Sequence, residues 1–467
     1  IAFDKERIDS VEMYPYKQLI RKGLSGVMVA HLNIPSLESR SGYPSTLSKH
    51  IVTDILKERL EFNGLVITDA LNMKGASNFS KPGDVDLTAF KAGNDILLIS
   101  ENIAKGVQKI EKAYNIGEIT EQRLAHSVKK ILMAKYKVGL NNYKPVGTYN
   151  LVEDLNSIED NILHHKLIEN AITVIKNKNN LPVKRLENKN IAYVKLGDAS
   201  GDTFYNELIK YNKVDYIKAD RLDDLIQKLN KYNTVIVGYH KPNKSPWDSY
   251  KFKDNELVWL YEIARTNNII LNVFAKPYAL LDLKTNTNFE SIVVSYQNSK
   301  VAQQKTAQLI FGAIPAKGKL PVSAGKDFEA GIGIEFEPIN ILSYGIPESV
   351  GVNSDLLEKI DSVANFAVNE KMTPGIQLLV ARKGKVIFNR NYGKHTYKGS
   401  NKVDFNDIYD VASLTKIIAT LPLLMELEEK GIVSLDSKLS TILPDLKESN
   451  KEDITIKKML SHYAQLR

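Results

Sequence analysis

One carboxylate and one histidine follow apolar runs in positions that could support chemistry. Asp69 comes directly after the run at residues 64–68, and His31 comes directly after the run at residues 26–30. Apolar runs between helical segments predict parallel strands buried on both faces. Because catalytic groups gather at the carboxyl ends of such strands, Asp69 is a candidate catalytic residue and His31 a candidate substrate contact. The residues alone also allow Asp69 to cap a helix and His31 to be a hydrogen-bonded loop residue.

A serine and a lysine form the second candidate pair. Ser413 and Lys416 stand three residues apart at the predicted start of a helix, so their side chains share one face and can hydrogen-bond. A lysine with a lowered pKa can take the proton of a serine, which then attacks as a nucleophile. The competing interpretation is a helix-capping serine beside a surface lysine, because this spacing is common by chance.

The elements that must position Asp69 and His31 lie in residues 1–150. Strands are predicted at 26–30, 64–68 and 95–99, helices at 47–60 and 85–92, and a polar linker at 141–165. Each crossover has the length that a right-handed βαβ unit requires, so three such units are expected.

Residues 151–340 form a second predicted α/β domain with a mainly parallel sheet. Its strands are expected at 191–195, 214–218, 234–239, 269–274 and 291–296, and its helices at 163–171, 203–211, 222–232, 255–265 and 301–311. A Gly- and Pro-rich stretch at 311–321 ends the domain, and residues 331–347 are predicted to be a linker.

Residues 341–467 form the third predicted domain. A helix is expected at 354–371, a β-hairpin from strands 375–381 and 386–392, and a helix from Ser413 to about residue 430. The chain is thus predicted to be a mixed α/β multidomain protein.

Composition excludes several classes of function. The net charge of +8 comes mostly from lysines dispersed along the 467 residues, which disfavours nucleic-acid binding. The chain has no cysteine, and its eight histidines form no H-E-x-x-H pattern, so neither a metal nor a cofactor is predicted. No window approaches the ~18 apolar residues of a membrane span.

Four segments in the first domain resemble successive signatures of glycoside hydrolase family 3, particularly its β-N-acetylhexosaminidase branch. They are residues 27–31, 44–48, 64–75 and 92–98. The resemblance implies the C-terminal part of a TIM-like (β/α)8 barrel, in which Asp69 is the nucleophile. The family's His and Asp acid/base pair belongs to an upstream motif that this sequence lacks, so the chain is expected to begin after it.

The other two domains carry resemblances of their own. Residues 151–340 resemble the α/β sandwich that follows the barrel in many members of the same family. Residues 409–413, 427–436 and 454–462 resemble serine β-lactamases of the class C type and penicillin-binding esterases, whose serine and lysine carry over to Ser413 and Lys416. The N-terminal part of that α+β domain is implied. Later motifs of the family are absent, so truncation at both ends is expected.

These resemblances imply a retaining exo-β-N-acetylglucosaminidase of the bacterial periplasm or cell envelope. Its substrate would be a small carbohydrate or a fragment of peptidoglycan or chitin, and the chain by itself is expected to be inactive. One alternative is a serine acyl hydrolase, such as a β-lactamase, an esterase or a D-aminopeptidase, using Ser413 and Lys416. A second is a catalytically degenerate polymer-binding protein. The oligomeric state stays open.

Overall fold

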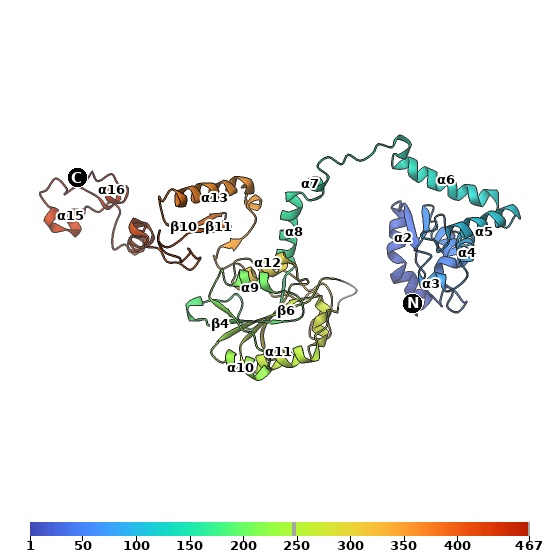
Figure 1. Ribbon diagram of the computed structural model, residues 1–467, viewed down its shortest axis with the longest axis horizontal. Coiled ribbons are helices and arrows are strands. Elements are labelled where there is room, and N and C mark those ends of the chain that lie inside the picture. The colour runs from blue at the N-terminus through green and yellow to red at the C-terminus, as the bar shows by residue number, and fades with distance from the viewer. Residues whose placement is uncertain (245–248, 466–467) are drawn as a thin grey trace. The chain divides into compact units, whose positions relative to one another are not determined.

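A computed structural model describes residues 1–244 and 249–465 of the chain (Figure 1). It divides into two compact units, Ile1–Tyr149 and Asn150–Arg467. In the described residues no helix is both long enough and apolar enough to cross a membrane.

The first unit is built on two parallel strands, β1 (Gly26–Val29) and β2 (Leu65–Thr68), paired with Val27 opposite Val66. Val27 and Val66 are buried in a core with Val52, Leu56 and Phe62. Helices and helical turns surround this pair: α1 (Lys5–Arg7), η1 (Ile8–Glu12), α2 (Tyr14–Arg21), η2 (Ser45–Leu47), η3 (His50–Arg59), α3 (Lys74–Ser77), α4 (Asp84–Ala92), α5 (Ile103–Asn115), α6 (Glu121–Lys137) and η4 (Leu140–Asn142).

The prediction of a third strand at 95–99 is wrong. Only Ile96 forms an isolated bridge, to Ile67 of β2. The pairing ends there because the Leu98 N–H bonds to the Thr68 hydroxyl and Ile99 adopts a φ of +43°, which turns the backbone away. The carbonyls of Leu98 and Ile99 then accept from Leu71 and Asn72, just beyond β2.

The second unit contains a six-stranded sheet in the order β3-β8-β7-β6-β4-β5. The strands are β3 (Thr173–Asn177), β4 (Ile191–Leu196), β5 (Val214–Tyr216), β6 (Thr234–His240), β7 (Ile269–Phe274) and β8 (Phe289–Val294). All neighbours pair in parallel except β3, which runs antiparallel to β8. The mainly parallel sheet is confirmed, although β3 was not predicted and β8 begins two residues early.

Helices cover both faces of this sheet (Figure 1). On one face α10 (Leu222–Leu229) and α11 (Asp254–Thr266) pack through Leu225 and Leu260. On the other, α9 (Asp202–Leu208) and α12 (Lys300–Ile310) pack through Phe204 and Leu309. Every residue of β6 and β7 is buried, which explains why both strands are mostly apolar in the sequence. Helices α7 (Leu151–Leu155) and α8 (Ile158–Ala171) precede the sheet, and helical turns η5 (Leu186–Asn188) and η6 (Pro277–Asp282) lie within its loops.

A smaller sheet of order β10-β11-β9 follows in the same unit. Strands β10 (Gly375–Arg382) and β11 (Lys385–Gly393) form the predicted antiparallel hairpin, whose turn residues Lys383 and Gly384 both have positive φ. Strand β9 (Ser343–Tyr344) lies in the segment predicted to be a linker and pairs in parallel with β11. Turn η7 (Pro347–Val350) and helix α13 (Ser354–Asn369) connect β9 to β10.

The last part of the chain is helical and its apolar side chains are largely exposed. The predicted helix is confirmed as three consecutive segments, η8 (Ala412–Leu414), η9 (Lys416–Thr420) and α14 (Leu421–Glu429). Short segments α15 (Leu439–Ile442), η10 (Pro444–Leu446) and α16 (Ile456–Leu460) follow. Residues 466–467, which the sequence analysis placed in this domain, lie outside the described residues.

Candidate functional site

Asp69 lies at the carboxyl end of β2, as predicted. Its N–H donates to the Val29 carbonyl at 3.0 Å, which extends the pairing of β1 and β2 by one residue. Its half-buried carboxylate accepts one hydrogen bond, from the Ala70 N–H to Oδ1 at 2.7 Å. Oδ2 has no partner among the described residues. The alternative helix-capping role is wrong, because the next helix, α3, begins at Lys74 with Met73 at its cap position.

Both ring nitrogens of His31 have hydrogen-bond partners. Nδ1 is 2.9 Å from the Thr46 hydroxyl, and Nε2 is 2.9 Å from the Ala70 carbonyl. Since a carbonyl can only accept, Nε2 carries a proton and donates it. The histidine thus joins the end of β1 to the residue after Asp69, which agrees with the hydrogen-bonded loop role that the sequence left open. Its role as a substrate contact stays a prediction.

Two buried hydroxyls hold the carboxyl end of β1. The Ser45 hydroxyl donates to the Ala30 carbonyl at 2.6 Å, and Thr46 Oγ1 lies 2.7 Å from the same oxygen. Both side chains are almost fully buried. Neither residue was predicted from the sequence to be functional, although both belong to the 44–48 segment that carried the resemblance. Thr46 is connected to the residue after Asp69 through His31, whereas Ser45 has no hydrogen bond to His31.

A buried ion cluster that the sequence analysis missed supports the start of β2. The fully buried carboxylate of Asp95 accepts from the Val66 N–H at 3.0 Å and from the Ser127 hydroxyl at 2.5 Å. Lys130 and Lys57 lie 3.2 and 3.5 Å from it. Burial raises the pKa of Asp95, but these hydrogen bonds and cations outweigh it and hold the pKa below its usual value. Burial lowers the pKa of Lys57 to about 8.

Ser413 and Lys416 meet as their spacing predicts. Lys416 Nζ donates to Ser413 Oγ at 3.0 Å, and both side chains are exposed. Ala412, just before the serine, has a φ of +43°, and its N–H donates to Asp410 Oδ1 at 2.7 Å. No other side chain within residues 1–244 and 249–465 hydrogen-bonds to the serine hydroxyl. The catalytic role of this pair stays a prediction.

The chain therefore carries two candidate sites, one in each compact unit. Asp69 and His31 belong to the first unit, and Ser413 and Lys416 to the second. In the described part of the chain, no three histidine, aspartate or glutamate side chains are grouped so that they could hold a metal ion.

Comparison with known proteins gives two family matches. Residues 1–134 match the family described as glycosyl hydrolase family 3 N terminal domain, and residues 363–467 match the β-lactamase family. The resemblance of the first domain to glycoside hydrolase family 3 and that of the third domain to β-lactamases are thereby confirmed. The two families are hydrolase families.

Curated relatives match parts of the chain. β-Hexosaminidase A of Pseudoalteromonas piscicida is 26% identical over 207 residues, which cover 39% of this chain and 33% of the relative. The β-hexosaminidase of Idiomarina loihiensis is 31% identical over 139 residues, or 30% of this chain and 40% of the relative. The matched segments thus span only about a third of the length of such relatives.

Solved structures share the fold over a longer stretch. A glycoside hydrolase family 3 β-N-acetylglucosaminidase from Paenibacillus sp. is 21% identical, with a TM-score of 0.54, covering 69% of this chain and 63% of that one. The β-glucoside phosphorylase BglX has a TM-score of 0.58 at 21% identity, covering 69% of this chain and 62% of its own. At this identity the likeness concerns the fold alone.

Proposed function

We propose that this chain, which joins a glycoside hydrolase family 3 segment to a β-lactamase segment, belongs to a retaining exo-β-N-acetylglucosaminidase with Asp69 as its nucleophile. The observation that carries the proposal is the Asp69 carboxylate at the end of β2. One of its oxygens is tied to the Ala70 N–H and the other is without a protein partner among the described residues. A nucleophile needs such an oriented, unshared oxygen.

The chemistry proceeds in two steps. Asp69 Oδ2 attacks the anomeric carbon of the terminal sugar, and the bond from that carbon to the departing oxygen breaks as the glycosyl ester forms. The departing oxygen takes a proton from a general acid, for which we assign no residue of this sequence. Water then hydrolyses the ester, so the product keeps the configuration of the substrate and Asp69 is regenerated.

A mechanism-based inactivator tests the nucleophile in the complete protein. A 5-fluoro N-acetylglucosaminide is expected to form a stable ester with Asp69, identified by mass spectrometry of the peptide that contains it. Asp69→Asn is expected to lose turnover and labelling, whereas Asp54→Asn, which removes an exposed carboxylate of η3 in the same unit, should retain both. Labelling of another carboxylate, or normal turnover by Asp69→Asn, refutes the assignment.

The finer domain assignment belongs to the same proposal. Residues 1–150 supply the C-terminal part of a (β/α)8 barrel, residues 151–340 the α/β sandwich and residues 341–467 the N-terminal part of a β-lactamase-like domain. The parallel pair β1–β2 and the six-stranded sheet of the second unit support this division.

The names of the relatives support the proposed substrate and location. Several are named bacterial β-hexosaminidases, and another is a secreted glycosyl hydrolase of Arthroderma benhamiae. We propose that the protein acts in the bacterial periplasm or cell envelope on sugars derived from peptidoglycan or chitin. Release of N-acetylglucosamine from purified peptidoglycan fragments, compared with chitin oligomers, distinguishes the two substrates.

A second candidate function is serine acyl hydrolysis. The observation that favours it is the 3.0 Å hydrogen bond between Lys416 Nζ and Ser413 Oγ, which places a base within reach of the serine proton. Labelled penicillin should acylate the complete protein at Ser413. Loss of the label in Ser413→Ala but not in Ser461→Ala, a serine of a neighbouring helical segment, supports this activity. Equal labelling of Ser413→Ala and the parent protein refutes it.

A further inference from the structure

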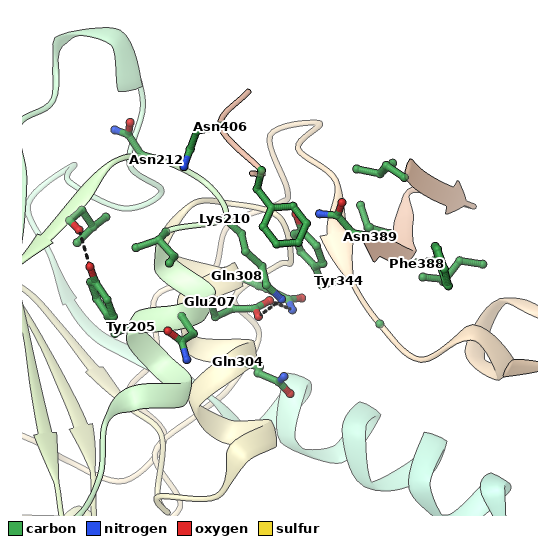
Figure 2. Close-up of a pocket in the computed structure, with 18 of the residues that line it drawn as sticks. Tyr205, Glu207, Lys210, Asn212, Gln304, Gln308, Tyr344, Phe388, Asn389 and Asn406 are labelled. Carbon is green, nitrogen blue, oxygen red and sulfur yellow. Dashed lines mark hydrogen bonds and ion pairs between the residues drawn. The ribbon is translucent and has the colours of Figure 1, made fainter. Parts of the chain in front are cut away.

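The second unit contains a large cavity, and neither Ser413 nor Lys416 lines it. Its volume is about 1320 Å³. One wall comes from α9, the start of β5 and α12, and the opposite wall comes from β9, β10, β11 and residues 404–406 (Figure 2). Small-molecule sites commonly enclose ~300–1,000 Å³, so this space admits a ligand of two or more rings.

The wall formed by α9 and α12 carries a continuous network of buried polar side chains. Gln308 Nε2 donates a hydrogen bond to Glu207 Oε1 at 2.8 Å (Figure 2). Lys210 Nζ donates to the other oxygen, Glu207 Oε2, at 2.6 Å. Lys305 lies 2.8 Å from Glu169 and 3.5 Å from the Gln308 oxygen. Glu207, Lys305 and Gln308 are each at least 97% buried. Because each charge of this network has a partner, the wall holds these polar groups in place before any ligand arrives.

Amide side chains with hydrogen-bonding capacity to spare also line the cavity. Gln304 of α12 and Asn206 of α9 have no hydrogen-bond partner for their side chains among the described residues. Asn389 of β11 also lines the cavity and lies beside Tyr344 (Figure 2). Each amide offers two donors and one acceptor, which matches a ligand rich in hydroxyl or acetamido groups.

The charges around the cavity balance. Three lysines line it (Lys210, Lys213 and Lys305), and so do three carboxylates (Glu207, Asp215 and Asp404). Burial together with nearby Lys305 lowers the pKa of His165, so this histidine adds no charge at neutral pH. A phosphorylated or strongly cationic ligand would find no net opposite charge here. A neutral polar ligand meets no such penalty.

Aromatic rings complete the lining on the side of the small sheet. Tyr344 of β9 is held by Lys210, whose Nζ lies 4.2 Å from the ring centroid. Phe388 of β11 and the 59% exposed Phe405 add apolar surface. Aromatic faces pack against the C–H surfaces of a ring while fixed polar groups bind its hydroxyls.

From this lining we propose that the cavity binds a neutral oligosaccharide through residues of the second unit. Fixed polar groups on one wall, spare amides, balanced charge and aromatic faces all favour an uncharged polyhydroxylated ligand. The proposal depends only on the second unit, so it stands or falls independently of the glycosidase activity.

Photo-crosslinking in the complete protein tests the proposal. The probe is a diazirine derivative of N,N′-diacetylchitobiose, and the sites of attachment are mapped by mass spectrometry. We expect labelling of peptides within residues 205–215, 304–308 or 377–406, competed away by free N,N′-diacetylchitobiose. The double variant Gln304→Ala/Asn389→Ala should reduce this labelling at least tenfold.

Two further variants make the test decisive. Gln304→Glu keeps the shape of the side chain but places an unbalanced negative charge in the cavity, and it should also reduce labelling. Asn188→Ala removes an exposed amide of the same unit and should not. Labelling confined to other peptides, labelling that free sugar does not displace, or full labelling of folded Gln304→Glu overturns the proposal. Labelling near Asp69 reports separately on the glycosidase site.

Discussion

His31 Nε2 donates a hydrogen bond to the carbonyl oxygen of Ala70 at 2.9 Å, across 39 residues of sequence. Ala70 in turn donates its N–H to the Asp69 carboxylate. The ends of β1 and β2 are therefore joined by a side chain as well as by backbone pairing, and the orientation of the Asp69 carboxylate depends on this link.

This link predicts how His31→Ala affects catalysis by the complete protein. If His31 positions the Asp69 loop, kcat should fall by about 10- to 100-fold while KM changes little, because a small misplacement of a reacting group is costly. If His31 contacts the substrate, KM should rise. Steady-state kinetics on a chromogenic N-acetylglucosaminide distinguishes the two, with His126→Ala, on an exposed position of α6, as the control.

The ion cluster at Asp95 predicts a large effect on stability. Asp95→Asn leaves Lys57, Lys130 and Arg123 without their common counter-ion and should lower the free energy of unfolding of the first unit by about 3 kcal/mol. Urea denaturation of this variant should be compared with that of Asp54→Asn. This substitution of an exposed side chain is expected to change the free energy of unfolding by less than ~0.5 kcal/mol. A similar midpoint for both variants would show that the cluster contributes little.

His240 predicts a pH dependence for the second unit. It is fully buried, stacked on Phe274, and its ring nitrogens lie 2.9 Å from the Tyr193 hydroxyl and 2.7 Å from Asn298 Oδ1. Burial lowers its pKa to about 4, although the Asn298 hydrogen bond acts the other way. Between pH 6.5 and 4 the unfolded chain therefore binds a proton that the folded chain does not, and stability falls as the pH falls through this window.

The free energy of unfolding of the second unit should fall by about 3 kcal/mol across this pH range, at about 1.4 kcal/mol for each pKa unit. Thermal unfolding of the second unit measured between pH 7 and 4 should show it. His240→Gln should flatten this dependence, while His164→Gln, at an exposed position of α8, should leave it unchanged. A parent protein whose second unit keeps the same stability from pH 7 to 4 would contradict the prediction.

Limited proteolysis should separate the chain's parts by their burial. Residues 135–156 are exposed throughout, and Lys144 lies in a stretch without helix or strand, so trypsin should cut there first. The six-stranded sheet is buried on both faces, so a fragment covering about residues 165–335 should persist. Early cleavage inside β4, β6 or β7 would show that this sheet is less stable than its burial implies.

The local sequence pattern was sufficient to predict several secondary-structure elements. Strands β4, β6 and β7 are mostly apolar because both faces of the sheet are covered, so they can be recognised in the sequence. The β10–β11 hairpin follows from its two alternating runs and the turn between them. The end of an apolar run located Asp69, and helical spacing alone predicted the hydrogen bond from Lys416 to Ser413.

The strands and hydrogen bonds that depend on segments distant in the sequence were determined only by the tertiary structure. Residues 95–99 do not form a strand because the backbone groups of Leu98 and Ile99 hydrogen-bond to residues at and beyond the end of β2. Strand β3 forms because β8 lies beside it and pairs with it. The partners of His31 and Asp95 come from segments 15 to 39 residues away, and the walls of the cavity come from several segments between residues 165 and 406. A local pattern records which face of an element is buried, but it does not record which polar groups meet there, because that depends on how the chain brings distant segments together.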